Sequence, residues 1–401
     1  MDKFSQPALA DYLKRAADID GRCEAAFAAV EGAFRDNFKR GELGAAVTVY
    51  HRGQVVVDLW GGFQDLSQTT PWGRDTRVCA FSLNKCVTAA SAHLAVYDGV
   101  LDYDAPVARY WPAFAAADKG ATTVRQVLSH TAGLPGIRRP LTAAQATDWT
   151  LVGDALATQR PFWPAGAYHG YHMGTYGLLL AHLVEHVRGR PYVALFGELC
   201  ARLGIDAALT VTDSADIAAF VQPQPVTIAL DTSAERREML RCVYENPPDV
   251  GGGDISGEVP LDRIAANTAG WRARLNPSVC GFWTARDMAR FGLMFAGSSS
   301  PLAPELRDEL LRPQVDGVDD VLGVPVCYTM GFQRWIPQRT IGPNPAGSFF
   351  AHGFGGAMLV IDDDYDFVIA YLMNAAGPRN SWLNRYNSAL ISAVYESLAG
   401  P

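Results

Sequence analysis

Strand-like sequence stands near both ends of this chain, and helix-like sequence fills the middle. Residues 44–62 read as two β-rich runs around an Arg52-Gly53 turn, which is typical of a hairpin. Further β-rich segments come only late in the chain, at 326–335, 347–353, 357–363 and 366–374. Strands this far apart share a core only if the two ends of the chain meet. The pattern predicts an α+β fold in which early and late strands form one antiparallel sheet.

The same pattern divides the chain into two domains. We expect residues 1–90 and 318–401 to form the sheet domain, and residues 91–317 to form an inserted, mostly helical domain. Terminal helices should flank the sheet, because apolar residues recur at helical spacing near both ends. The expected helices include 20–39, 82–97, 175–189, 284–295 and 382–398. Residues 243–275 are rich in Gly, Pro and Asp and predict a long loop.

Composition excludes several classes of protein. Hydrophobic residues make up 49% of the chain and charged residues 19%, as in globular proteins. A formal net charge of -8 argues against a nucleic-acid partner. The seven cysteines form no C-x-x-C pair, so neither a disulfide framework nor a metal site is expected. With no secretory signal and no apolar run of 18 residues, we expect a cytoplasmic protein that does not bind membranes.

The first chemical signal is the S-x-x-K tetrad formed by Ser82 and Lys85. Both residues fall at the start of an expected helix, where positions three apart share a face. A serine hydroxyl needs a neighbouring base to act as a nucleophile, and a desolvated lysine can be that base. Free N–H groups at a helix start also favour an oxyanion. No other serine in the chain has a lysine three residues later.

Rival motifs are weaker. The chain contains no G-x-S-x-G nucleophile elbow and no H-E-x-x-H metalloprotease motif. Ser129 and His130 are adjacent, and adjacent residues rarely place a nucleophile and its base correctly, so we interpret this pair as part of a supporting turn. The sequence therefore favours Ser82 as the nucleophile, with no cofactor and no metal.

Three segments together resemble a known family. They are FSLNK at 81–85, VRQVLSHTAGLP at 124–135 and WPAGAYHGYHMGTYGLL at 163–179. In this order they resemble the class C β-lactamase and penicillin-binding-protein superfamily, and within it the family VIII carboxylesterases most closely. The resemblance extends over roughly residues 20 to 398. It implies a serine β-lactamase-type fold, with the active site between the sheet domain and the helical domain.

The resemblance also assigns catalytic roles. Ser82 matches the acylated serine, Lys85 its partner, and Tyr171 the tyrosine of the second motif, with Tyr168 as a rival three residues earlier. Either Lys85 or Tyr171 could be the general base. Met173 occupies the place of an asparagine that binds substrate in the β-lactamases. This departure is similar to the esterase branch and implies weak or no β-lactamase activity.

The third motif is matched by the stretch from Ala351 through His352, Gly353, Phe354 and Gly355 to Gly356. Two registers are open, one anchored on the glycines and one anchored on His352. In the first, which we prefer, the N–H groups of Phe354 and Ser82 form the oxyanion hole. His352, Gly353 and Gly355 then belong to the substrate-binding strand. Trp163 is assigned to the substrate-binding site: with Phe162 and Phe354 it could line an apolar acyl pocket, although all three could instead belong to the core.

The resemblance implies a carboxylesterase that forms an acyl-enzyme with a small-molecule ester of short chain length. A transacylase on the same scaffold is the first alternative, because water could be replaced by an alcohol or an amine. A non-catalytic penicillin-recognising sensor is the second. The complete set of Ser82, Lys85 and Tyr171 argues against the sensor, since binding alone does not require it.

Overall fold

The predicted end-to-end sheet is present. The computed structural model describes residues 9, 13–213, 217–222, 233–244, 265–297, 300–337, 341–343, 347–377 and 383–399. Within these residues lies a nine-stranded antiparallel sheet. Its strands, in spatial order, are β1 Ile19–Cys23, β3 Gln54–Gly62, β2 Gly44–His51, β11 Phe367–Met373, β10 Met358–Asp362, β9 Ser348–His352, β8 Gln333–Arg334, β7 Pro325–Tyr328 and β6 Val315–Val318. The α+β fold class is confirmed.

The two ends of the chain join at β2 and β11. These strands pair along their whole shared length, from Phe367 opposite His51 to Met373 opposite Ala45. All residues of β11 are buried, which is typical of a strand covered on both faces. The predicted hairpin turn is also confirmed: Arg52 and Gly53 have φ angles of 49° and 72°, as a type I′ turn requires.

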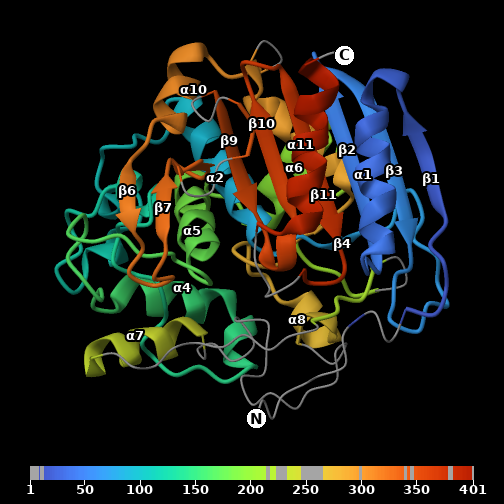
Figure 1. The fold of residues 1–401 in the computed structure, drawn as a ribbon. Coiled ribbons are helices and arrows are strands. Elements are labelled where there is room, and N and C mark those ends of the chain that lie inside the picture. The colour runs from blue at the N-terminus through green and yellow to red at the C-terminus, as the bar shows by residue number, and fades with distance from the viewer. Residues whose placement is uncertain are drawn as a thin grey trace.

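Helices cover the sheet and build the inserted region. Helices α1 (Ala28–Lys39) and α11 (Arg385–Ala399) pack side by side on the near face of the sheet in Figure 1. Helix α9 (Ala285–Gly292) packs on β2, β10 and β11. The remaining α-helices are α2 Asn84–Tyr97, α3 Val124–Leu128, α4 Trp149–Thr158, α5 Tyr176–Arg188, α6 Tyr192–Leu203, α7 Ala234–Tyr244, α8 Ala269–Ala273 and α10 Pro304–Leu311. A short pair, β4 (Val78–Cys79) with β5 (Phe282–Trp283), stands beside α2.

Two predicted elements are wrong in part. The expected helix 20–39 begins instead with the edge strand β1, and α1 starts only at Ala28. Gly21 explains the change, because a Cβ there would lie 2.1 Å from the carbonyl oxygen of Asp58, so only glycine lets β1 approach β3. The expected strand 326–335 is two strands, since Gly331, at φ 109°, turns the chain between β7 and β8.

Other expectations hold or lie outside the described residues. The helix at 175–189 is confirmed as α5, closed by Gly189 at φ 63°. Of the predicted loop 243–275, residues 245–264 are not described, and the rest includes α8. Trp382, the expected start of the last helix, is also not described. The limits of the two domains stay a prediction. In the described part of the chain, no helix is long and apolar enough to cross a bilayer.

Candidate active site

Ser82 sits at a sharp turn between β4 and α2. A 3-10 helix at Phe81–Leu83 leads directly into α2, and Phe81 has a φ of 46°. A bulky residue in the left-handed region is strained, and such strain collects at functional sites. The turn leaves Ser82 half-buried while Phe81 and Leu83, on either side, are buried. The hydroxyl is therefore held at the start of a helix and is still reachable.

Lys85 lies against this hydroxyl. Its Nζ is 3.0 Å from Ser82 Oγ and 2.9 Å from the carbonyl oxygen of Ser278. The side chain is only 5% exposed, and burial lowers the pKa of Lys85 well below its usual value. A neutral amine in this position donates to Ser278 and can accept the serine proton.

The segment from Asn276 to Trp283 holds the start of α2 in place, although no sequence motif marks it. Ala80 N–H donates to the Gly281 carbonyl at 2.8 Å. Asn84 donates from its amide to the Cys280 carbonyl and accepts from Trp283 Nε1 at 2.8 Å. Ser278 Oγ bonds to Gly174 and Gly177, next to the Tyr171 loop. A single segment therefore connects Lys85, α2 and the loop that carries the tyrosine.

Tyr171 completes the group. It is 7% exposed, and Lys85 Nζ lies 4.7 Å from the centre of its ring. Burial raises the pKa of the Tyr171 phenol, and a hydrogen bond with Ser82 partly opposes this effect. At neutral pH the phenol therefore keeps its proton, while Lys85 tends to lose one. The predicted Ser82, Lys85 and Tyr171 lie together.

A buried carboxylate fixes the wall behind Tyr171. Asp319 is fully buried and accepts hydrogen bonds from the N–H groups of Val321 and Leu322 and from Tyr328 Oη at 2.9 Å. The Tyr171 backbone N–H also bonds to it. The rings of Tyr328 and Tyr171 are stacked, with centroids 6.3 Å apart. No sequence motif marked Asp319 or Tyr328, because their role depends on the folded hairpin of β6 and β7.

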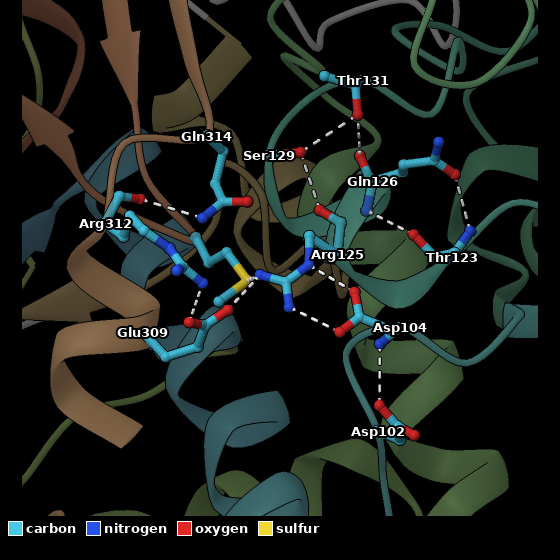
Figure 2. Close-up of polar contacts among 11 residues, drawn as sticks. Asp102, Asp104, Thr123, Arg125, Gln126, Ser129, Thr131, Glu309, Arg312 and Gln314 are labelled. Carbon is cyan, nitrogen blue, oxygen red and sulfur yellow. Dashed lines mark hydrogen bonds and ion pairs between the residues drawn. The ribbon is translucent and has the colours of Figure 1, made fainter. Parts of the chain in front are cut away.

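The Ser129-His130 turn is built as a support. Thr123 caps α3 in a capping box with Gln126, and Ser129 Oγ bonds back to the Arg125 carbonyl at 2.8 Å. Arg125 forms ion pairs with Asp104 and Glu309, as Figure 2 shows. These contacts hold the turn in place from both sides.

The third motif lies at the end of β9, beside the nucleophile. Ala351 and His352 line the same small cavity as Ser82, Lys85 and Tyr171. His352 Nε2 is 3.0 Å from the amide of Gln333, a second cavity residue that the sequence did not reveal. The remaining aromatic and imidazole walls are His130, Tyr176, Tyr328, Phe332 and Phe350.

The glycines after His352 allow close packing on the nucleophile turn. A Cβ on Gly353 would lie 2.4 Å from the Ala80 carbonyl oxygen, so the strand end and the turn before Ser82 are in close contact. Gly355 has a φ of 83°, which favours glycine. The Phe354 ring packs on Phe81, with centroids 5.6 Å apart, and does not line the cavity beside Ser82.

Trp163 lies elsewhere. It lines a second cavity of about 760 Å³ together with Phe162, Tyr168 and Arg138, and none of these four lines the cavity beside Ser82. Trp163 and Tyr171 share one apolar cluster, so Trp163 packs behind the tyrosine. The rival Tyr168 is exposed. The described residues contain no group of three His, Cys, Asp or Glu side chains placed to hold a metal ion.

Comparisons with known proteins agree with this geometry. The family model for Beta-lactamase matches residues 22–392. Esterase/beta-lactamase LipL of Mycobacterium tuberculosis is 37% identical over 376 residues, which are 89% of this chain and 83% of the relative. A penicillin-binding protein homologue from Caulobacter crescentus superposes with a TM-score of 0.82 at 32% identity, covering 95% of this chain and 100% of that one. A family VIII carboxylesterase gives a TM-score of 0.80 at 30% identity, with 95% and 100% covered. The resemblance predicted from three motifs is confirmed: the chain belongs to the β-lactamase family and is a serine hydrolase of that fold.

Proposed function

We propose that this protein is a carboxylesterase that transfers the acyl group of a short-chain ester to Ser82 and then to water. One observation carries the proposal. The Nζ of a buried lysine whose pKa is lowered lies 3.0 Å from the Oγ of a serine at a helix start. A lysine that is neutral at working pH is the general base that a serine nucleophile requires.

In the proposed mechanism Lys85 takes the proton of Ser82 as Oγ attacks the ester carbonyl. The developing oxyanion accepts hydrogen bonds from the backbone N–H groups of Ser82 and Phe354. We propose this role because Ser82 lies at the helix start and Phe354 directly follows Gly353. Tyr171 keeps its proton at rest, and it gives that proton to the departing alkoxide as the tetrahedral intermediate collapses. Lys85 returns the proton to Tyr171. Water then attacks the acyl-enzyme by the reverse path.

Two side chains favour esters over β-lactams. Met173 is apolar and packs against the cluster that contains Tyr171, so it offers no amide to a β-lactam side chain. Ala351 likewise gives no polar group at the strand edge. The named activities of the relatives, an esterase/β-lactamase and a family VIII carboxylesterase, agree with an ester substrate.

The test measures p-nitrophenyl butyrate turnover and fluorophosphonate labelling of the purified protein. We expect hydrolysis of the ester, a single label on Ser82 by intact-mass and peptide analysis, and loss of both in Ser82→Ala. Ser91→Ala is the matched control, because Ser91 lies on the same helix and bonds to Tyr192 rather than to Lys85. Labelling without turnover of any ester would contradict the proposal and favour the sensor.

A second arm of the same test examines the acyl acceptor. The ester is incubated with and without a large excess of an alcohol or amine acceptor, and both products are quantified. Hydrolysis as the main reaction supports an esterase. If transfer dominates at millimolar acceptor and hydrolysis is negligible, the protein is a transacylase instead.

A further inference from the structure

His130 is a buried polar side chain that the mechanism above does not use. It is 6% exposed and has a φ of 61°, a strained angle for a residue other than glycine. Its ring is surrounded by the rings of Tyr171 at 5.0 Å, Tyr328 at 4.7 Å and Tyr176 at 4.4 Å, measured between centroids. The fold therefore places this imidazole at a defined site among the aromatic residues behind the nucleophile.

The hydrogen bonds of the neighbouring loop define the tautomer of His130. The backbone N–H of His172 donates to His130 Nδ1 at 3.0 Å, so Nδ1 is an acceptor and carries no proton. The ring of His172 is fixed in turn, because its Nδ1 donates to the Gly170 carbonyl at 2.6 Å and its Nε2 accepts from Leu134 N–H at 3.0 Å. A neutral His130 therefore carries its proton on Nε2.

This Nε2–H has no hydrogen-bond partner among the described residues. His130 lines the cavity beside Ser82, and the polar walls of this cavity also include Lys85, Tyr171, Gln333 and His352. The cavity volume of about 20 Å³ is enough for roughly one water molecule, and a buried water needs two to four polar partners. The site supplies that number.

We propose that His130 is a positioning residue whose Nε2–H holds one water in this cavity, and that this water donates a hydrogen bond to the phenolic oxygen of Tyr171. The inference rests on the proposed esterase function. As Tyr171 passes its proton to the leaving alkoxide, negative charge grows on its oxygen. A donated hydrogen bond stabilises that charge, because charge-assisted hydrogen bonds are stronger than neutral ones. His130 thus makes Tyr171 a better acid without touching the substrate.

The surroundings keep His130 neutral, as this role requires. Burial lowers the pKa of His130 well below its usual value, and Lys85, His169 and His172 act in the same direction. The ionisable groups that face it are Lys85 from α2, His169, Tyr171 and His172 from the loop before α5, Tyr176 from α5 and Tyr328 from β7. Asp319 holds Tyr328 from behind.

The experiment compares two leaving groups in the full-length His130→Phe variant. An alkyl butyrate needs the proton of Tyr171, whereas p-nitrophenolate leaves as an anion without it. We expect kcat for the alkyl ester to fall about tenfold, the size of one lost hydrogen bond, with KM unchanged. We expect kcat for the p-nitrophenyl ester to change by less than about twofold. An equal loss on both esters would show a structural role and overturn the proposal.

Two further variants keep the test decisive. In a Tyr171→Phe background, His130→Phe should have no additional effect on the alkyl ester, because His130 acts through the phenol. His130→Asn keeps a hydrogen-bond donor and tolerates a positive φ, so it should recover part of the activity. It also replaces the phenylalanine variant in the test if that variant does not fold.

The matched control is His182→Phe. His182 is a buried histidine stacked on Trp149, outside the cavity, and it should leave the ratio of the two esters unchanged. A wild-type protein inactive on both esters would refute the proposed function itself, whereas an active wild type with an unchanged ratio in His130→Phe would refute only the role of His130.

Discussion

Glu42 should make this protein less stable as the pH rises, and replacing it with glutamine should remove that dependence. The side chain is 3% exposed, lies two residues before β2 begins at Gly44, and accepts a hydrogen bond at Oε2 from Tyr371 Oη of β11. Its other oxygen, Oε1, is buried without a hydrogen-bond partner among the described residues. Burial raises the pKa of Glu42 to about 8, although the bonds from Tyr371 and Leu43 oppose the shift.

The size of the effect follows from the two pKa values. Below the unfolded pKa of 4.5 the carboxyl of Glu42 is protonated in both the folded and the unfolded state, so its ionisation does not change the free energy of unfolding. Above 4.5 the unfolded chain loses the proton and the folded chain keeps it, so the free energy of unfolding falls as the pH rises to about 8. At pH 7 the interval is roughly 2.5 pH units, and at ~1.36 kcal/mol per unit the loss is ~3 kcal/mol. Glutamine has the same shape, cannot ionise and retains an acceptor for Tyr371.

Urea unfolding, followed by tryptophan fluorescence at pH 5.5 and at pH 8, measures this effect. We expect the free energy of unfolding of the wild type to drop by ~3 kcal/mol more than that of Glu42→Gln between these two pH values. Other titrating groups cancel in the comparison. Glu31→Gln, at a partly exposed residue paired with Arg35 on α1, is the control and should behave as the wild type does. Parallel pH profiles for wild type and Glu42→Gln would refute the reasoning.

Three predictions concern the site. Lys85→Ala should lower kcat/KM for p-nitrophenyl butyrate by on the order of a thousandfold, since nucleophile and base act as a unit; a loss below tenfold would exclude Lys85 as the base. Tyr171→Phe should reduce kcat for an alkyl ester roughly a hundredfold. Tyr168→Phe, at an exposed residue beside the other cavity, should match the wild type. A large loss in Tyr168→Phe with none in Tyr171→Phe would assign the proton donor to Tyr168. Nitrocefin turnover, read by absorbance, should be far below ester turnover, and Met173→Asn should raise it, because the amide restores a polar contact; equal rates on both substrates in the wild type would contradict this.

The sequence predicted the reacting groups better than their supports. Ser82 and Lys85 are three residues apart on one helix, so local geometry alone brings them together. Ser278 and Asp319 act through a backbone carbonyl and through a buried carboxylate, and neither role leaves a spacing that a reader of the sequence could detect. For Trp163 the sequence suggested a role that its position does not support. Its place next to the second motif suggested an acyl pocket, but the side chain packs behind Tyr171 and lines another cavity.

For the fold too, elements formed by residues close in the sequence were predicted better than those that depend on distant contacts. Alternation and turn residues reveal a hairpin such as β2 and β3, because both partners are close in the sequence. Strand β1 has mostly exposed residues and no alternation, so only its pairing with β3 defines it. The break between β7 and β8 depends on Gly331, where a Cβ would lie 2.5 Å from Ala89 on α2, a contact that exists only after folding.

The pairing of β2 with β11 affects how this chain is made in a cell. His51 meets Phe367, a residue more than 300 positions later, so the centre of the sheet cannot close until most of the chain has left the ribosome. At roughly 5–20 residues per second, the β2 edge waits for about a quarter of a minute to a minute. During that interval an apolar strand edge is open to pairing with other chains. Chains that stop before Phe367 should therefore aggregate, and slow translation of the middle region should increase the demand for chaperones.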